Sequence, residues 1–196
     1  MLYLIIILVT IAVVTAANLL FTIPITPQEI GSALFAVVLA TVAIIAVDGI
    51  TALIIRRLTP KSWYAPPKKL FKVSKKERDF YKAIKIKSWK DRVPELGGFT
   101  SFHKDKLESN SDPAYLERFI IEANYGVVIH LVNAILGFVI MFIPFCASPT
   151  IWIPVFAVNF ILSMLPVAIL RYTSYTLQNL YNRCKKKENA QRKETV

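Results

Sequence analysis

The chain has 196 residues, of which 55% are hydrophobic, and its mean hydropathy is +0.48. It carries 24 Lys and Arg against 13 Asp and Glu, which gives a formal net charge of +11. Such a high mean hydropathy argues against an ordinary soluble domain of this length. Hydropathy and charge together indicate one membrane domain that also carries strongly basic segments.

Four long apolar stretches follow one another along the chain. They cover Met1–Ile23, Ile30–Ile55, Tyr125–Cys146 and Thr150–Leu170. Each is close to the ~20 residues that an α-helix needs to cross ~30 Å of hydrocarbon. We therefore predict an all-α integral membrane protein with four transmembrane helices in two hairpins. The alternative for the first stretch is a secretory signal peptide, but it lacks a basic leading region and its apolar run is too long.

The basic residues set the predicted orientation. None of the 24 lies in residues 1–55, whereas 17 lie in 56–124 and seven in 171–196. Because basic segments stay on the cytoplasmic side, both termini should be cytoplasmic. The predicted organisation is a first transmembrane hairpin (1–55), a basic cytosolic insertion (56–124) between helices two and three, a second hairpin (125–170) and a basic cytosolic tail (171–196).

Neither a metal site nor a disulfide is expected. Cys146 and Cys184 are predicted on opposite sides of the membrane, so they cannot pair, and no Cys/His cluster has zinc spacing. The chain has no Walker loop, HExxH, GxSxG or GxGxxG motif. The basic insertion contains no recognisable nucleic-acid-binding module, so no nucleic-acid partner is expected.

The insertion contains a predicted amphipathic helix, Val73–Ile86. Ser74 would cap it, with Glu77 three residues later. Such a basic helix with an apolar stripe is predicted to lie in the plane of the lipid headgroups. The side chains that would share this stripe are Phe80, Tyr81 and Ile84.

Three further segments follow from local signals. Ile86–Phe99 contains a proline and a glycine pair, which predict a compact loop against the membrane. Asp112 is a helix cap and Pro113 a first helical residue, and that helix is predicted to continue into the third span. Asn182–Val196 has no apolar periodicity, and we predict a solvated end that touches lipid.

Two ionisable side chains at membrane depth are functional candidates, because lipid penalises such groups. At 1.5 Å per residue, His130 would lie roughly 9 Å and Asp48 roughly 10 Å from the inner boundary. An aspartate can hold an imidazole in one tautomer and make it a better base. The alternative is that each merely bonds to backbone or solvates an interface.

One face of the third helix carries small and polar residues at three- and four-residue steps. They are Glu122, Gly126, His130, Asn133 and Gly137. This face is either a substrate groove or a helix-packing surface, and for Gly126 and Gly137 packing is slightly favoured. Asn133 and Asn159 could likewise hydrogen-bond across helices.

Several short motifs occur in a fixed order. They are Lys87-Ser88-Trp89-Lys90-Asp91, Pro94-Glu95-Leu96-Gly97, Glu122 eight residues before His130, and Leu165-Pro166 followed by Arg171-Tyr172. In order and spacing these resemble the glycosyl-4,4'-diaponeurosporenoate acyltransferase family, over roughly Phe80–Leu177. Where the family pattern has Arg-Ala-Glu before its histidine, this chain has Tyr125-Gly126-Val127.

The resemblance implies a multi-pass protein of the bacterial cell membrane that transfers a fatty acyl group to a hydroxyl of a glycosylated or lipid acceptor. The donor would be a thioester of coenzyme A or of an acyl carrier protein, and no further cofactor is expected. His130 would act as the general base, oriented by Asp48 or Glu122.

The basic inner surface suits anionic donors, acidic carrier proteins and anionic lipid headgroups equally well. The residues predicted to bind donor or acceptor are Trp89, Lys90, Arg92, Asn133, Arg171 and Tyr172. Arg171 is equally well explained as an interfacial anchor. The rival functions are a non-catalytic membrane scaffold that binds a partner and, less favoured, a small transporter.

Overall fold

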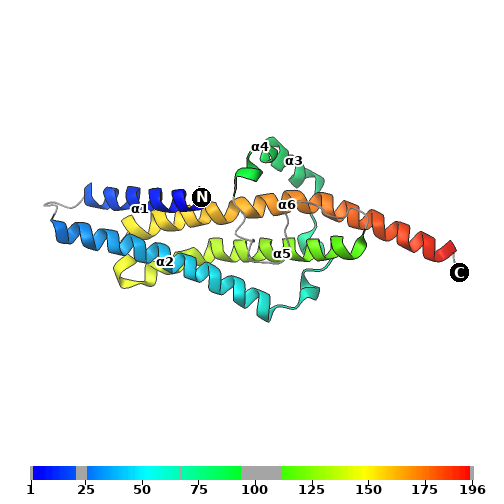
Figure 1. Ribbon diagram of the computed structural model, residues 1–196, viewed down its shortest axis with the longest axis horizontal. Coiled ribbons are helices and arrows are strands. Elements are labelled where there is room, and N and C mark those ends of the chain that lie inside the picture. Colours follow the sequence, from blue (N-terminus) through cyan, green and yellow to red (C-terminus); the bar gives the residue numbers. More distant parts are fainter. Residues whose placement is uncertain (1, 21–25, 67, 94–111, 195–196) are drawn as a thin grey trace. The chain divides into compact units, whose positions relative to one another are not determined.

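A computed structural model describes residues 2–20, 26–66, 68–93 and 112–194 (Figure 1). The described residues form helices and turns, with no strand among them. The all-α fold class is therefore confirmed. The long helices are α1 (Leu2–Leu20), α2 (Pro27–Leu58), α5 (Pro113–Leu136) and α6 (Pro149–Glu194). The shorter ones are η1 (Lys61–Trp63), η2 (Lys69–Phe71), α3 (Lys75–Ala83), α4 (Ile86–Trp89), η3 (Lys90–Arg92), η5 (Gly137–Phe142) and η6 (Pro144–Cys146).

The chain divides into two compact units. The apolar unit consists of Met1–Ile54 and Ile129–Leu165, and the basic unit of Ile55–Val128 and Pro166–Val196. All 24 Lys and Arg fall within the basic unit, as their positions in the sequence show. The helices α2, α5 and α6 each run from one unit into the other without interruption.

Three helical segments are long and apolar enough to cross a membrane: α2, α5 with η5, and α6. They correspond to the second, third and fourth predicted spans. The first predicted span forms α1, but its apolar part Ile5–Leu20 falls among the shorter apolar helices. The four-span topology therefore stays a prediction.

In the apolar unit, α1, α2, η5, η6 and α6 share one hydrophobic core. Its buried members are Val14, Ala36, Val37, Ala40, Ile44, Ile140, Cys146, Ile151 and Val155. Asn18 joins α1 to α6 by donating from Nδ2 to the Thr150 carbonyl at 3.0 Å. Many large apolar side chains on the outer faces remain exposed, Leu53 and Phe142 among them. Outer faces of this kind are expected where lipid is the solvent.

Two predicted helix starts are confirmed. The Ser74 hydroxyl accepts a hydrogen bond from the Glu77 backbone N–H at 3.1 Å and caps α3. Asp112 Oδ1 accepts one from the Ala114 N–H at 2.9 Å, directly before α5. As predicted, α5 then continues into the third apolar stretch.

The fourth helix does not stop near Leu170. Although it contains Pro154 and Pro166, α6 continues to Glu194, through most of the predicted tail. The physical reason is burial of apolar side chains, which stabilises the helix beyond Leu170. Leu177 is buried against α5, and three more apolar residues of α6 pack beside it. The α5 side of this contact is Leu116, Phe119 and Ile120, and the additional α6 residues are Leu180, Tyr181 and Cys184.

The segment after α3 is helical where a loop was predicted. α4 and η3 cover Ile86–Arg92, and Ile86 is fully buried. Lys85 precedes them with a positive φ of 53°, which is uncommon for a residue with a side chain and turns the chain into α4. The remainder of the predicted loop, including the motif Pro94–Gly97, lies outside the described residues. At the third span, the α-helix changes to 3-10 geometry at Gly137.

Candidate functional site

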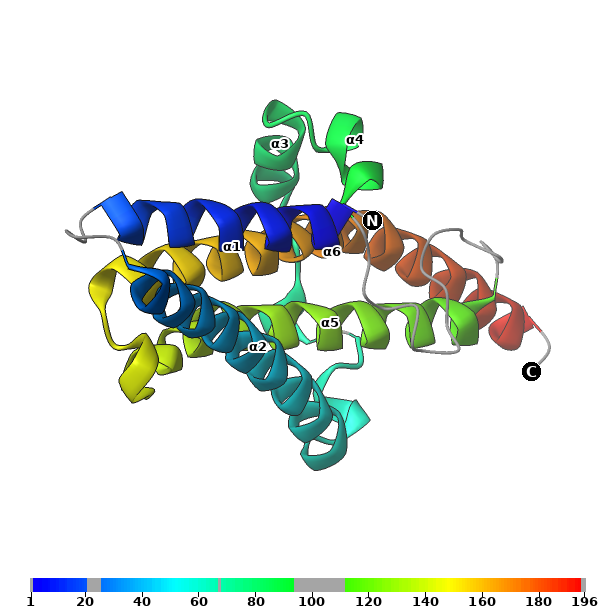
Figure 2. The ribbon, with the colours of Figure 1, turned by 60° about the vertical axis from the view of Figure 1, so that its left-hand side comes forward.

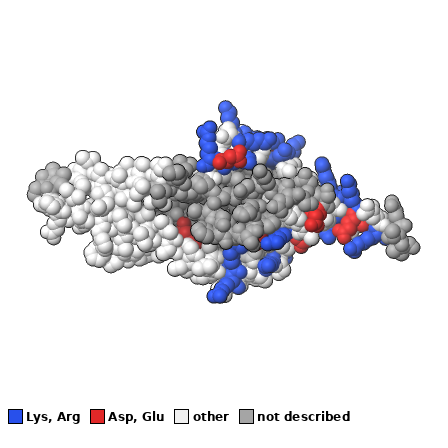
Figure 3. All heavy atoms as spheres, viewed as in Figure 1, with Lys and Arg blue, Asp and Glu red and all other residues white. Residues whose placement is uncertain are grey.

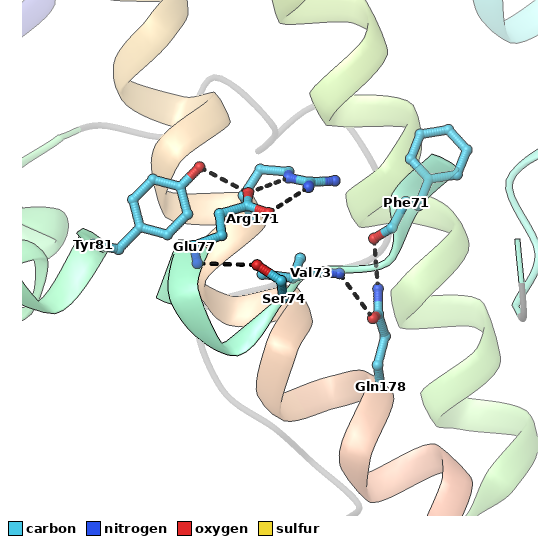
Figure 4. Close-up of polar contacts among 7 residues, drawn as sticks. All are labelled: Phe71, Val73, Ser74, Glu77, Tyr81, Arg171 and Gln178. Carbon is cyan, nitrogen blue, oxygen red and sulfur yellow. Dashed lines mark hydrogen bonds and ion pairs between the residues drawn. The ribbon is translucent and has the colours of Figure 1, made fainter. Parts of the chain in front are cut away.

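An ion pair fastens α3 to α6 inside the basic unit (Figure 4). Arg171 donates from Nε to Glu77 Oε1 and from Nη2 to Glu77 Oε2, both at 2.8 Å. The Tyr81 hydroxyl donates to the same Oε1 at 3.1 Å. The Arg171 and Glu77 side chains are 18% and 26% exposed. This bidentate geometry is the strongest form of a carboxylate–guanidinium contact.

The cluster holds fixed charges at neutral pH. Burial by itself would raise the pKa of Glu77, but hydrogen bonds and charge from Arg171, with hydrogen bonds from Tyr81 and Ser74, hold that pKa below its ordinary value. Burial, followed by the Glu77 charge and hydrogen bond, raises the pKa of Tyr81. Glu77 is thus ionised and Tyr81 neutral. The structure shows Arg171 as an anchor between helices, and its binding of an anionic substrate group stays a prediction.

Two further contacts follow the ion pair along α6. Gln178 donates from Nε2 to the Phe71 carbonyl at 2.8 Å and accepts from the Val73 N–H at 3.4 Å (Figure 4). The Arg78 guanidinium lies 4.6 Å from the ring centroid of Tyr175, a cation–π contact. These α6 contacts come from residues 171, 175 and 178, whose spacing of four and three places them on one face of the helix. We call the contacts together the α3 clamp.

The last turn of α2 and the residues that follow it are bonded to α5. Arg56 donates from Nη1 and Nη2 to Glu122 Oε2 at 3.1 Å, and its guanidinium lies 5.5 Å from the Tyr125 ring centroid. Tyr64 stacks on Tyr125 with centroids 3.8 Å apart. Asn124 donates to the Tyr64 carbonyl at 2.8 Å. The Glu122 carboxylate, one candidate for orienting His130, is therefore engaged by Arg56.

An open pocket of about 360 Å³ lies beside this contact, at the start of α5. It is lined by Lys61, Ala114, Glu117, Arg118, Ile121 and Glu122. Its walls carry both signs of charge, and Glu122 is the predicted site residue among them.

The structure brings three predicted donor-binding residues together on α4 and η3. Trp89 donates from Nε1 to the Ile84 carbonyl at 3.1 Å, which holds the indole against the end of α3. Lys90 pairs with Asp91 at 2.8 Å, and Arg92 is exposed. Tyr172 is half-buried on α6, next to the clamp arginine.

The predicted catalytic pair lies in the apolar unit. His130 is half-buried on α5 and Asp48 is half-buried on α2. Asp48 Oδ1 is buried and accepts no hydrogen bond within the described part of the chain. The pairing of Asp48 with His130 therefore stays a prediction.

About two turns beyond His130, where α5 gives way to η5, the same face serves helix packing. A Cβ on Gly137 would lie 2.7 Å from Asn159 Nδ2 and 3.2 Å from a ring carbon of Phe156, so α6 approaches closely there. Asn159 also donates from Nδ2 to the Asn133 carbonyl at 3.3 Å. This supports the packing interpretation for Gly137. Asn133 is buried, and its Oδ1 accepts no hydrogen bond from any described residue.

Both cysteines are free. Within the described ranges, no group of three or more His, Cys, Asp or Glu is arranged to hold a metal ion.

The sequence matches the family described as glycosyl-4,4'-diaponeurosporenoate acyltransferase over residues 60–183. The chain belongs to this family. The acyltransferase assignment suggested by the motifs is thereby confirmed at the level of the family. For this acyltransferase-family protein, the matched range includes the α3 clamp, the α4–η3 residues and His130. No curated protein and no solved structure matches the chain.

The clamp residues on α6 beyond Arg171 were missed by sequence reasoning. Tyr175 and Gln178 continue the spacing of Arg171, and that signal becomes visible once α6 is extended past Leu170. Glu77 was assigned to the helix cap, and nothing local indicates that a residue 94 positions away would pair with it.

Proposed function

We propose that this protein is a membrane-bound enzyme that transfers a fatty acyl group from a thioester donor to a hydroxyl of a glycosylated or lipid acceptor. The observation that carries the proposal is the family match over residues 60–183. His130 supports it, because an imidazole on an otherwise apolar helix segment is costly unless it has a function.

In the proposed reaction, His130 takes the proton of the acceptor hydroxyl as that oxygen attacks the thioester carbonyl. The tetrahedral intermediate collapses, the carbon–sulfur bond breaks, and the departing thiolate takes the proton back from the imidazolium. Asp48 or Glu122 orients the ring. Trp89, Lys90 and Arg92 hold the donor, whose coenzyme A phosphates or acidic carrier protein suit a basic surface.

Replacing His130 by Ala should lower acyl transfer by about 10²–10⁴-fold, the range that a general base contributes. The measurement is lipid mass spectrometry of a deletion strain complemented with each variant, at matched protein levels. His103→Ala, at the only other histidine in the sequence, is the control and should restore the acylated lipid. Asp48→Asn should lower transfer if Asp48 orients the ring. Undiminished transfer by the His130→Ala variant would remove the mechanism.

We further propose four transmembrane helices in a bacterial cell membrane, with both termini in the cytoplasm. The absence of Lys and Arg from residues 1–55, and the part that α1 takes in the apolar core, support this arrangement. It is tested in a cysteine-free background (Cys146→Ser with Cys184→Ser). In intact cells, an impermeant thiol reagent should label Ser148→Cys, just before α6. It should label Ser62→Cys, in η1, only after the cells have been permeabilised.

A fluorescent protein fused to the N-terminus separates four spans from three. It should fluoresce if the N-terminus is cytoplasmic, because many such reporters do not fold after export. A dark but expressed fusion, with the two cysteines labelled as expected, would establish three spans.

A further inference from the structure

The segment 68–90, which contains η2, α3 and α4, is unusually basic. It has ten Lys and Arg against two acidic residues, a net charge of +8 over 23 positions. Both acidic side chains are already paired, Glu77 with Arg171 and Asp79 with Lys82. Lys90 is paired in turn with Asp91, just after the segment. A large excess of positive charge remains, and Lys and Arg gather over α3 and α4 in Figure 3. We call residues 68–90 the α3 shelf.

Large apolar side chains are exposed among these lysines. Leu70 is 81%, Phe80 60% and Ile84 41% exposed. Phe80 and Ile84 are four residues apart, which places them on one face around the end of α3. Tyr81, predicted to share their stripe, instead points to Glu77. The exposed apolar surface therefore excludes Tyr81 and consists of Phe80 and Ile84 at the end of α3, with Leu70 in η2.

The shelf is bonded to α6 directly after the apolar part of that helix ends. Arg171 follows the apolar stretch that closes at Leu170, and it is the residue that binds Glu77. Basic residues at that position mark the inner membrane boundary. Figures 1 and 2 agree that, within the basic unit, α3 and α4 project to one side of the α5–α6 pair. With the membrane topology proposed above, the clamp would hold a basic and partly apolar surface beside the headgroup layer.

We propose that the α3 shelf binds anionic phospholipids of the cytoplasmic leaflet. Its lysines would contact lipid phosphates, while Leu70, Phe80 and Ile84 would enter the boundary between headgroups and acyl chains. Of the shelf residues, only Trp89 and Lys90 are assigned to the proposed acyl transfer, so lipid binding by Lys72, Lys75, Lys76 and the three apolar residues is separate from it. The exposed apolar face favours lipid over an acidic carrier protein, which basic charge alone would attract.

The end of α6 supplies a matched comparison. Residues 182–194 are also rich in Lys and Arg, but within the described part of the basic unit no large exposed hydrophobic residue lies on α6. Glu188 additionally pairs there with Lys185 and Arg192. This end therefore has the charge of the shelf without its apolar face.

The test uses the full chain in nanodiscs of phosphatidylcholine with small amounts of spin-labelled phosphatidylglycerol or phosphatidylcholine. Electron paramagnetic resonance then gives the relative association of the two lipids with the protein. One variant replaces Lys72, Lys75 and Lys76 by Gln, and its control replaces Lys186, Lys187 and Lys193. Removal of positive charge from the first turn of α3 should not destabilise that helix.

The wild-type protein should prefer phosphatidylglycerol, and the preference should fall as salt is raised. The shelf variant should lose up to about fivefold in preference per lysine, from the ~1 kcal/mol that a basic residue gains at an anionic surface. The control variant should keep most of the preference. Equal loss in both variants, or no preference in the wild type, would overturn the proposal.

A second measurement examines the apolar face. A bimane label on Phe80→Cys, in a background without Cys146 and Cys184, should be quenched by lipids brominated near the headgroup end of the chains. An unquenched label that acyl carrier protein shields instead would assign the shelf to a carrier protein and contradict lipid binding. Acyl transfer is not a readout in either experiment, so their outcome is independent of the proposed activity.

Discussion

Replacing Glu77 by Ala is expected to detach α3 from α6 and to lower the free energy of unfolding by about 2–3 kcal/mol. The expectation lies between the 3–5 kcal/mol for breaking a buried pair and the 0–1 kcal/mol for an exposed one, because both side chains are largely but not fully buried. The loss leaves the Arg171 guanidinium without its carboxylate. Thermal unfolding of the full chain in detergent measures the effect, and faster tryptic cleavage within residues 68–93 reports detachment of α3.

Asp79 provides the control on the same helix. Its carboxylate is 51% exposed and pairs with Lys82 at 3.4 Å, so Asp79→Ala should change stability by less than about 1 kcal/mol. The exchanged pair Glu77→Arg with Arg171→Glu should recover part of what either single change loses. Equal effects of Glu77→Ala and Asp79→Ala would show that the ion pair does not hold α3.

The same contact has a defined pH dependence. Because the folded protein holds the pKa of Glu77 below its ordinary value of 4.5, folding is favoured by ionisation of this group. That stabilisation is fully present above the ordinary pKa and is lost as the pH falls through the lower, folded pKa. The measurement is the thermal unfolding temperature between pH 7 and pH 3.5, because trypsin is not active at the acidic end of this range. The unfolding temperature of the wild type should fall toward pH 3.5, and it should fall less in the Glu77→Gln variant.

Substituting Gly137 by Ala should destabilise the apolar unit by about 1–3 kcal/mol, the cost of overpacking a close contact. The added Cβ would lie 2.7 Å from Asn159 Nδ2, so this amide must move. Its hydrogen bond to the Asn133 carbonyl at 3.3 Å would then be lost or weakened. Thermal unfolding in detergent is the measurement.

Gly49 is the matched control, since it lies within α2 and a Cβ there meets nothing within 4 Å. Gly49→Ala should be neutral or stabilising by up to about 1 kcal/mol, because alanine is the better helix former. If both substitutions behaved alike, close approach of η5 and α6 at Gly137 would not be a determinant of packing.

The fold was predictable from the sequence where local chemistry decides it. Apolar runs of sufficient length identify the helices, and short polar signals at Ser74 and Asp112 identify where two of them begin. The end of α6 was not predictable in this way. Proline at position 166 and the basic composition after it suggested a tail, whereas burial of Leu177 against α5 keeps that segment helical. Tertiary packing there outweighs the local signals.

The family was also predictable, because Trp89, Lys90, Glu122, His130 and Arg171 occur in a recognisable order. The match over residues 60–183 confirms the family. The ion-pair partners of Glu122 and Arg171 were not predictable from the sequence, because they come from segments far apart in the chain. Glu122 lies 66 positions from Arg56, and Arg171 lies 94 from Glu77. The roles assigned to Asp48 and His130 stay predictions, and Asp48 Oδ1 is a buried oxygen without a hydrogen bond within the described residues.

The contacts that α6 makes within the basic unit limit how this part of the helix can change in length. At 3.6 residues per turn, one residue inserted between Arg171 and Gln178 would rotate the side chains after it by about 100° about the helix axis. Arg171 and Gln178 could then no longer both face the segment that holds α3, whatever the inserted residue. Insertions and deletions are therefore expected to be better tolerated in the connections between helices than between Arg171 and Gln178, where they would break the register of the α3 clamp.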